Sequence, residues 1–297
     1  MAVFLQVART GSFSAAGRAV GMTPSSAAKL VTRVEGRLGA RLVERSTRRL
    51  RLTAEGELYR QRAEELLEEL DALDAGIAGG AAAPKGLVRV NASVPFGRHC
   101  LLPLLPDFAA AFPQMRLELS LTDAVVDFYE ARCDVAFRVG GLADSGLAAV
   151  RLGLARRRVV AAPSYLAARG TPKTAADLES HDCLGFAFRR AAAVWPLKSG
   201  GRLVDREIRV RFAVGDGETA RELAVMGLGL ARLAEFHVAA DLAAGRLVSV
   251  LDDVVVDAEE IHALHFGRRN LPSRIRIFLD FMTPRLRAAL AAGNGPR

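Results

Sequence analysis

The residue types that most often carry catalysis or bind metals are few in this chain and lie far apart. The 297 residues include five histidines and three cysteines. His262 and His265 are three residues apart, but their segment has the pattern of a strand, where that spacing places two side chains on opposite faces. No cysteine and histidine spacing matches a zinc site, and the motifs of nucleotide-binding and hydrolytic enzymes are missing. The sequence predicts no catalytic residue, no metal and no cofactor.

Cys183 has a neighbour that could activate its thiol. It directly follows His181 and Asp182, and a nearby imidazole can lower the pKa of a thiol. Nothing else of a catalytic triad accompanies it, so Cys183 is either a packing residue or a redox-sensing thiol. Together with Cys100 and Cys133 it forms no CxxC pair, which indicates no disulfide framework and is consistent with a reducing cytosol.

The positive charge of this chain is concentrated in its N-terminal part. Residues 1–60 contain 11 Lys and Arg against 4 Glu and no Asp, a net charge of +7 out of +8 for the whole chain. The remaining residues are therefore close to neutral. A compact basic domain typically binds a polyanion. The charge distribution predicts one part that binds nucleic acid and a second part with another task.

Three short helices are predicted in the basic segment, over residues 1–8, 13–20 and 24–38. Thr23 suits the N-cap of the third helix and Pro24 its first position. At about 100° per residue, one stripe of this helix is apolar and is expected to be buried. The stripe consists of Ala27, Leu30, Val31, Val34 and Leu38, and the opposite face carries Ser25, Lys29 and Thr32, with Arg33 at its flank. This pattern is typical of a helix-turn-helix, although the solvated face of a small bundle would look the same.

A basic hairpin is predicted directly after these helices. Leu50 and Leu52 alternate with Arg49 and Arg51, which gives one apolar and one cationic face. Such a hairpin beside a helix-turn-helix is a wing that can contact phosphate or the minor groove. A run of arginines is more often only a solvated surface, but its position here favours DNA contact.

Four stretches, in this order, resemble the DNA-binding domain of LysR-type transcriptional regulators. They are GSFSAA at 11–16, TPSSAAKLVTRVE at 23–35, LGARLVERSTRR at 38–49 and LTAEG at 52–56. Family members usually begin a few residues earlier, so the first helix is expected to be short, and Ala28 stands where many carry a serine. The resemblance implies a winged helix-turn-helix over residues 1–53. Its expected DNA-binding residues are Thr23, Pro24, Ser25, Ser26, Lys29, Thr32, Arg33, Arg45, Arg48 and Arg49, with the arginines mainly at phosphate and minor groove.

A long helix is predicted over residues 54–78, with Thr53 as its N-cap. Its apolar residues recur at spacings of three and four, which is a heptad seam: Tyr59, Ala63, Leu66, Leu70, Leu73 and Ile77. A helix in the core of the same domain could show this seam too, but charged flanks favour an exposed helix with one apolar stripe. We therefore predict a homodimer through this helix, which suits two DNA half-sites. Residues 79–86 are predicted to form a flexible linker.

The C-terminal two-thirds alternate short apolar runs with helical stretches, a pattern that favours an α/β fold. Strand-like runs lie at 87–92, 116–121, 133–139, 158–162, 208–214 and 261–266, and helical stretches at 98–112, 218–226 and 235–243. This part is similar to the effector-binding domain of the same family, which has a periplasmic-binding-protein-like fold of two lobes joined by two crossing strands. The resemblance implies an effector domain over 87–297, with lobe one at 87–160 and 267–297 and lobe two at 161–266.

Three residues are candidates for contact with an effector. Ser93 follows the first strand of this part and precedes a helix, where backbone N–H groups favour an anion, although an ordinary strand-to-helix turn looks the same. Arg138 ends a strand near the expected cleft, where it could bind a carboxylate or form a salt bridge within its lobe. Thr219 could face the cleft, in a segment whose acidic residues fit helix capping. Phe188 and Trp195 suit the core of lobe two better than the lining of a pocket.

These features together predict a sequence-specific, DNA-binding transcriptional regulator and no enzyme. A small-molecule effector, for which carboxylates are one candidate class, is expected to bind between the lobes and to modulate DNA binding or bending. The resemblance further implies a homotetramer, which consists of two dimers, and RNA polymerase as a partner. No apolar run approaches the roughly 18 to 20 residues of a membrane helix, and no signal peptide is recognisable, so we expect a cytoplasmic protein without membrane contact. The alternatives are an enzyme or solute-binding domain with a basic oligomerisation module, and a redox sensor acting through Cys183.

Overall fold

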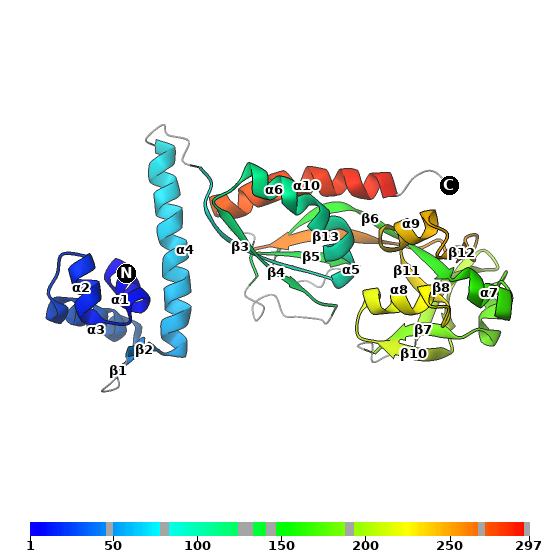
Figure 1. Cartoon of the computed structure of the whole chain (residues 1–297), viewed down its shortest axis with the longest axis horizontal. Helices are drawn as coiled ribbons and strands as arrows, with labels where there is room; N and C mark the ends of the chain where they lie inside the picture. The colour runs from blue at the N-terminus through cyan, green and yellow to red at the C-terminus, as the bar shows by residue number, and fades with distance from the viewer. Residues whose placement is uncertain are drawn as a thin grey trace. The chain divides into compact units, whose positions relative to one another are not determined.

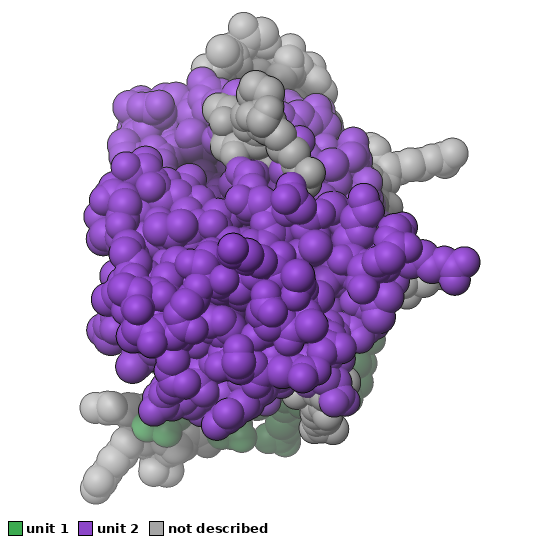
Figure 2. Space-filling view, turned by 90° about the vertical axis from the view of Figure 1, so that its right-hand side faces the viewer, with its two compact units in different colours: residues 1–82 green, residues 83–297 purple. Residues whose placement is uncertain are grey.

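The chain forms two compact units, residues Met1–Ala82 and Ala83–Arg297 (Figures 1 and 2). The computed structural model describes residues 1–45, 50–77, 83–123, 133–140, 147–187, 193–266 and 271–293. Within these ranges, no helix combines the length and the apolarity that a membrane span needs.

Unit 1 is a small helical domain with a two-stranded hairpin and one long helix. Its elements are α1 (Ala2–Thr10), α2 (Phe13–Ala19), α3 (Pro24–Leu38), β1 (Val43–Arg45), β2 (Leu50–Leu52) and α4 (Ala54–Ile77). Strands β1 and β2 pair antiparallel, with Val43 opposite Leu52. The three predicted helices and the predicted hairpin are confirmed. The predicted linker helix is confirmed as α4, in which the Thr53 hydroxyl accepts the N–H of Gly56 at 2.9 Å.

The core of unit 1 lies between α1, α2, α3 and the start of α4. Phe4 of α1 is 1% exposed and packs edge to face against Tyr59 of α4, with ring centroids 5.2 Å apart. From the predicted apolar stripe of α3, Ala27 and Val31 are fully buried. The prediction was wrong for Leu38, which is 44% exposed, because the core that α3 contacts ends at Val34.

Unit 2 is an α/β domain with many short helices. Its elements are β3 (Gly86–Ala92), α5 (Val94–Phe96), η1 (Gly97–Leu101), η2 (Leu102–Leu104), α6 (Leu105–Ala111), β4 (Met115–Leu121), β5 (Val135–Val139), β6 (Ala148–Ala161), α7 (Pro163–Arg169), η3 (Ala175–Ser180), β7 (Cys183–Phe186), β8 (Val194–Ser199), β9 (Arg202–Glu207), β10 (Val210–Val214), α8 (Gly217–Val225), β11 (Ala231–Ala234), α9 (Glu235–Ala243), β12 (Val248–Val250), β13 (Ala258–His265) and α10 (Ser273–Gly293).

A seven-stranded sheet in the order β11-β6-β13-β5-β3-β4, with β12 also paired to β6, organises unit 2. Strand β6 is 14 residues long. Its first part, 148–156, pairs with β13, and its last part, 157–161, pairs with β11 and β12. One hydrophobic core lies around β3, β5, β13 and α10, where α10 covers one face of the sheet, and separate cores lie around β7, α8 and α9 (Figure 1). We call these two parts lobe one and lobe two, and they confirm the predicted two-lobed α/β fold.

Several predicted positions in unit 2 differ from the structure. The expected boundary of lobe two at residue 266 included the segment of β13, but β13 pairs with β5 and belongs to the sheet of lobe one. The difference arises because β13 inserts between two strands that precede it in the sequence by about a hundred residues or more. Trp195 is 6% exposed and packs in a core of lobe two, as predicted. Phe188, residue 78 at the end of the predicted helix and residues 79–82 of the expected linker lie outside the described residues.

Gly56 lies where α4 comes close to the backbone of Leu42 in unit 1. A Cβ at Gly56 would lie 1.9 Å from the backbone oxygen of Leu42, whereas a Cβ at Gly36 has open space around it. We expect Gly56→Ala to lower the free energy of unfolding of unit 1 by roughly 3 kcal/mol, because a backbone atom must move. Gly36→Ala, the matched control in α3, should be neutral or stabilise by about 1 kcal/mol. Urea unfolding followed by hydrogen exchange of the α1–α3 amides measures both, and equal stability of the two variants would contradict the close approach of α4 to the backbone of Leu42.

Candidate functional site

The start and outer face of α3 carry most of the predicted DNA-binding residues. Six of them are exposed: Thr23, Pro24, Ser25, Lys29, Thr32 and Arg33. Ser26 is half-buried. Thr23 is the N-cap of α3, where its hydroxyl accepts the N–H of Ser26 at 3.2 Å. Thr23 therefore positions the start of the helix, while the longer side chains project from it.

The electrostatics of α3 favour an anionic partner. Lys29, Arg33 and Arg37 are exposed, and none of the exposed residues of α3 is acidic. The one acid of this helix, Glu35, accepts the N–H groups of Leu42 and Val43 at 2.8 and 3.1 Å. Its negative charge is thus used to hold the start of the hairpin and does not cancel the cations of the exposed face.

The structure describes only part of the wing. Arg45 lies in β1, opposite Leu50, but its side chain, together with Arg48 and Arg49, lies outside the described residues. Arg51 of β2 is exposed, and the flanking Leu50 and Leu52 pack against the core of unit 1. The alternation of an apolar and a cationic face is therefore present in β2.

The predicted seam of α4 divides into two parts. Tyr59 and Ala63 pack into the core of unit 1. Leu66 and Leu70 are 51% and 50% exposed. The side chains of Leu73 and Ile77 lie outside the described residues. The first part of the seam is thus buried within its own domain, and of the described seam residues Leu66 and Leu70 remain exposed.

A polar edge in lobe one brings two of the predicted effector contacts together. Strand β3 pairs in parallel with β4 and with β5, so the three strands end at the same edge of the sheet. Ser93 directly follows β3, and Arg138 lies near the end of β5. Ser93 is half-buried and its hydroxyl does not cap α5. Ligands of open α/β sheets bind outside the carboxyl ends of parallel strands.

Arg138 is a half-buried cation without an acidic neighbour in ion-pair contact among the described residues. Its Nη1 donates to the backbone oxygen of Phe137 at 3.1 Å. Burial lowers the pKa of Arg138 from its ordinary value, although the neighbouring Cys133 opposes this shift. A guanidinium that is partly removed from water and lacks a carboxylate is stabilised when an anion binds.

Asp123 completes this edge and was missed by the sequence analysis. It follows the end of β4, and its two carboxylate oxygens accept the N–H of Val94 at 2.8 Å and the N–H of Gly217 at 2.6 Å. Gly217 is the first residue of α8 in lobe two, and a Cβ there would lie 2.6 Å from Pro95 of lobe one. The two lobes therefore touch at a position where a carboxylate receives N–H groups from both. The position of Asp123 directly after a strand was the signal that could have found it.

Thr219 has a local role at the start of α8. The N-cap residue Asp216 accepts the backbone N–H and the hydroxyl of Thr219, both at 2.8 Å. Thr219 is exposed, and none of the hydrogen bonds among described residues joins it to Ser93 or Arg138. The capping interpretation of this segment is the one that the contacts favour.

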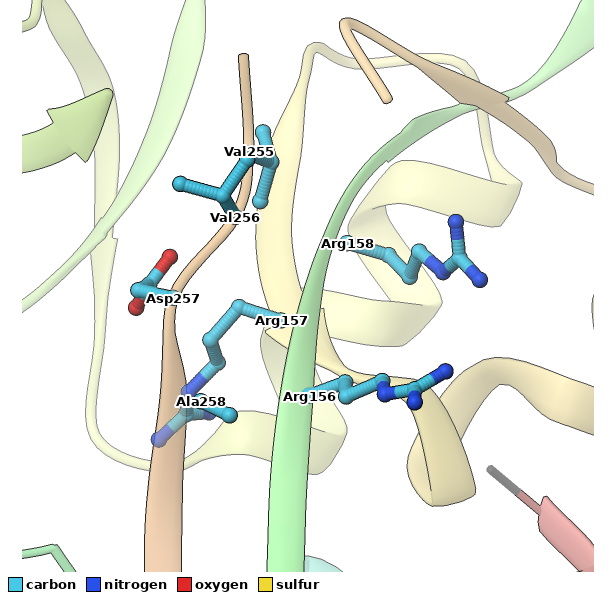
Figure 3. A pocket seen from close by; sticks show the side chains of 7 residues that line it. All are labelled: Arg156, Arg157, Arg158, Val255, Val256, Asp257 and Ala258. Atoms are coloured by element: carbon cyan, nitrogen blue, oxygen red, sulfur yellow. The ribbon is translucent and has the colours of Figure 1, made fainter. Parts of the chain in front are cut away.

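The segments where the chain passes between the lobes enclose a cavity of about 260 Å³, lined by Arg156, Arg157, Arg158, Val255, Val256, Asp257 and Ala258 (Figure 3). Arg157 points toward the segment with Asp257, whereas Arg156 and Arg158 point away from it. Arg157 pairs with Glu259, and Arg158 with Glu235 at 2.6 Å. These arginines are therefore neutralised by acids of the protein itself, which makes the cavity a poor site for an anion.

Three titratable side chains from distant parts of unit 2 also meet. His99, Glu218 and His237 place one ligand atom each within 4.8 Å of one another, the one group of this kind found among the described residues. No short sequence motif indicated them, because 119 residues separate His99 from Glu218. They are the described residues that could hold a metal ion.

Cys183 is fully buried, and burial raises the pKa of its thiol to about 12. His181, its neighbour in the sequence, directs Nδ1 to the hydroxyl of Tyr165 at 3.2 Å. A thiol with a raised pKa and no access to solvent is not activated, so the packing interpretation of Cys183 is favoured over a redox site.

Comparison with known proteins shows the same two parts. Residues 1–57 match the bacterial regulatory helix-turn-helix protein domain of the lysR family, and residues 81–287 match the LysR substrate binding domain. The chain is 36% identical over 288 residues to the HTH-type transcriptional regulator CrgA of Neisseria meningitidis serogroup C, covering 96% of both chains. It is 34% identical to an HTH-type transcriptional repressor of Pseudomonas aeruginosa, covering 95% of this chain and 90% of that protein.

Solved structures agree with the sequence comparison. The structure of CrgA from Neisseria meningitidis superposes with a TM-score of 0.65 at 35% identity, covering 96% of this chain and 97% of CrgA. The full-length virulence activator AphB of Vibrio cholerae gives a TM-score of 0.59 at 27% identity, covering 94% of this chain and 96% of AphB. The family and these relatives are regulators and not enzymes. With its exposed basic helix and its two-lobed second unit, the chain belongs to the LysR family of helix-turn-helix transcriptional regulators.

Proposed function

We propose that this regulator binds promoter DNA through the exposed face of α3 and the wing, and that a small anionic effector in unit 2 modulates its DNA binding or bending. The effector would occupy the polar edge where Ser93, Asp123 and Arg138 lie. The observation that carries this proposal is the half-buried guanidinium of Arg138, which has no carboxylate partner among the described residues. A ligand carboxylate supplies the missing charge, and a forked contact with a guanidinium is the strongest one available to it.

The contacts of Asp123 support the same site. Its carboxylate already receives one N–H from each lobe, so the position accommodates a negative group between the lobes. An effector carboxylate that competed for these N–H groups would change how lobe one and lobe two are joined. A ligand shifts a conformational equilibrium only through contacts that differ between the two states, and on this proposal the junction at Asp123 is where they would differ.

Oligomerisation belongs to the same proposal. We place the dimer contact on α4, where Leu66 and Leu70 are exposed, and a tetramer would form from two such dimers. A dimer places two copies of α3 on two half-sites. We further propose RNA polymerase as a partner and the cytoplasm as the location, since both follow from action on bacterial promoter DNA.

The anion site can be tested at Arg138. We expect Arg138→Gln to remove the stabilisation of the protein by its carboxylate effector, because the ligand loses the cationic partner that the described residues offer at this edge. A panel of small metabolite carboxylates is screened by thermal shift on the wild type, and a hit is then measured on the variant by calorimetry. Arg98→Gln, an exposed arginine in η1 of the same lobe, is the control and should bind as the wild type does. Unchanged binding to Arg138→Gln would place the effector elsewhere.

The DNA surface can be tested at Arg33. We expect Arg33→Ala to weaken binding to all duplexes and to reduce the slope of log K against log salt by about 1, because one phosphate contact is lost. Fluorescence anisotropy with duplexes from upstream of its own gene, at several salt concentrations, measures this slope. Arg202→Ala removes an exposed charge from β9 in unit 2 and should leave the slope unchanged. A slope that does not change in Arg33→Ala would remove this residue from the interface.

The dimer contact can be tested at the exposed leucines of α4. We expect the double substitution Leu66→Glu, Leu70→Glu to shift the protein toward monomer, since like charges would meet where apolar side chains pack. Sedimentation velocity over a range of concentrations measures the shift. Leu203→Glu is the control, because Leu203 is 56% exposed in β9 and lies in the other unit. If the dissociation constant of the dimer is equal in the wild type, the double variant and Leu203→Glu, α4 is not the main dimer contact.

A further inference from the structure

The cluster of His99, Glu218 and His237 lies where the lobes meet. His99 belongs to η1 of lobe one and Glu218 to α8 of lobe two. His237 belongs to α9, whose Phe236 packs on the core of lobe one and whose Val238 packs in a core of lobe two. The ligating atoms of all three side chains lie within 4.8 Å of one another. One small group could therefore contact three elements at once.

The donor atoms converge on one point. Oε2 of Glu218 lies 2.9 Å from Nε2 of His99 and 3.1 Å from Nε2 of His237. Two ligands at about 2.1 Å from a common ion and about 3 Å from each other subtend an angle of roughly 90° at that ion. The two separations from Oε2 thus suit neighbouring positions in the coordination sphere of a metal, and the two nitrogens, which lie within 4.8 Å of each other, must be no more than about 4.2 Å apart in the metal-bound site.

In the metal-free cluster each Nε2 donates its hydrogen to the Glu218 carboxylate, so a metal ion must displace these hydrogens to bind the two nitrogens. Burial lowers the pKa of His237 to about 4, so its ring is neutral at neutral pH. Burial opposes the ionisation of Glu218, but the pKa of Glu218 is lowered on balance, and the hydrogen bond from His99 is the largest cause of this lowering. A metal ion therefore need not displace a proton from the Glu218 carboxylate.

A surrounding layer of ion pairs orients the carboxylate. Arg221 donates to the other oxygen of Glu218, Oε1, at 2.7 Å. Arg221 is held in turn by the fully buried Asp241, with Nε 2.5 Å from Oδ2, and Asp241 also accepts from Arg246 at 2.7 Å. Oε2 is thereby directed toward the two histidines. Partners of this kind, one step beyond the ligands, fix ligand orientation in metal sites and raise affinity.

We infer that His99, Glu218 and His237 form a site for a divalent transition metal ion such as Zn²⁺, which joins lobe one to lobe two. Two imidazole nitrogens and one carboxylate oxygen select this class of ion over Mg²⁺ and Ca²⁺, which prefer oxygen ligands. The side chain of His99 is 25% exposed and that of His237 is 1% exposed, so an ion could enter from the side of His99. Water would complete its coordination there.

The consequence for unit 2 is a metal-dependent link between its lobes. The ion would hold η1 against α8 and α9, beside the junction formed by Asp123 and Gly217. Because the site exists only when the lobes are together, metal binding stabilises that arrangement by mass action. The link is separate from the DNA-binding surface of unit 1.

The experiment uses the full-length protein, stripped with a chelator and dialysed. We titrate it with Co²⁺, whose visible absorption reports nitrogen and oxygen coordination, and then displace the Co²⁺ with Zn²⁺. We expect one equivalent of metal per chain, and a higher midpoint of thermal unfolding with Zn²⁺ than without it. His99→Gln and Glu218→Gln should each weaken metal binding at least about tenfold and remove the thermal shift. His265→Gln, which alters a histidine outside the cluster, should bind as the wild type does.

The outcomes are distinguishable. Absence of a Co²⁺ spectrum in the wild type, or binding that His99→Gln and Glu218→Gln leave unchanged, would overturn the metal site and leave the cluster as a hydrogen-bonded contact between the lobes. Circular dichroism verifies that the variants are folded. If the buried Glu218→Gln variant does not fold, the partly exposed His99→Gln variant decides the question alone.

Discussion

The antiparallel pairing of β6 with β13 is the interaction on which the rest of unit 2 depends. Strand β6 continues without interruption from its partner β13 in lobe one to its partners β11 and β12 in lobe two. Both lobes are therefore parts of one sheet, and each lobe packs its own core against it. The chain crosses between the lobes near residues 156–158 and 255–258. The ion pairs at this crossing, Arg157 with Glu259 and Arg232 with Asp257, join the neighbouring segments.

The contact between the lobes is largely polar, beside the apolar packing of Phe236 on the core of lobe one. Asp123 accepts N–H groups from α5 and α8, and Glu218 is shared by two histidines and an arginine. Apolar packing between lobes would hold them in one arrangement, because few ligands could compete with it. Charged and hydrogen-bonded groups can exchange one partner for another at small net cost, provided that each keeps a partner. A junction of this composition suits a domain that responds to small ions or molecules.

Unit 1 differs from the junction between the lobes, because its charged side chains are exposed to solvent. Lys29, Arg33 and Arg37 remain on the outer face of α3, while Glu35 is turned toward the backbone of Leu42 and Val43. The same helix thus supplies a buried apolar stripe, an acid that holds the hairpin, and a cationic surface. Because these roles lie on different sides of one helix, the small domain needs few residues to present its charge to a duplex.

What the sequence by itself determined is local. The N-cap at Thr23, the limits of α3, the alternation in β2 and the concentration of charge in residues 1–60 all follow from neighbouring residues, and the structure has each of them. Only the tertiary structure decided that β13 lies between β5 and β6, that Asp123 joins two lobes, and that His99 meets Glu218 and His237. Such contacts depend on the order of strands in the sheet, and a pattern of hydrophobicity read along the chain carries no information about which distant strands become neighbours.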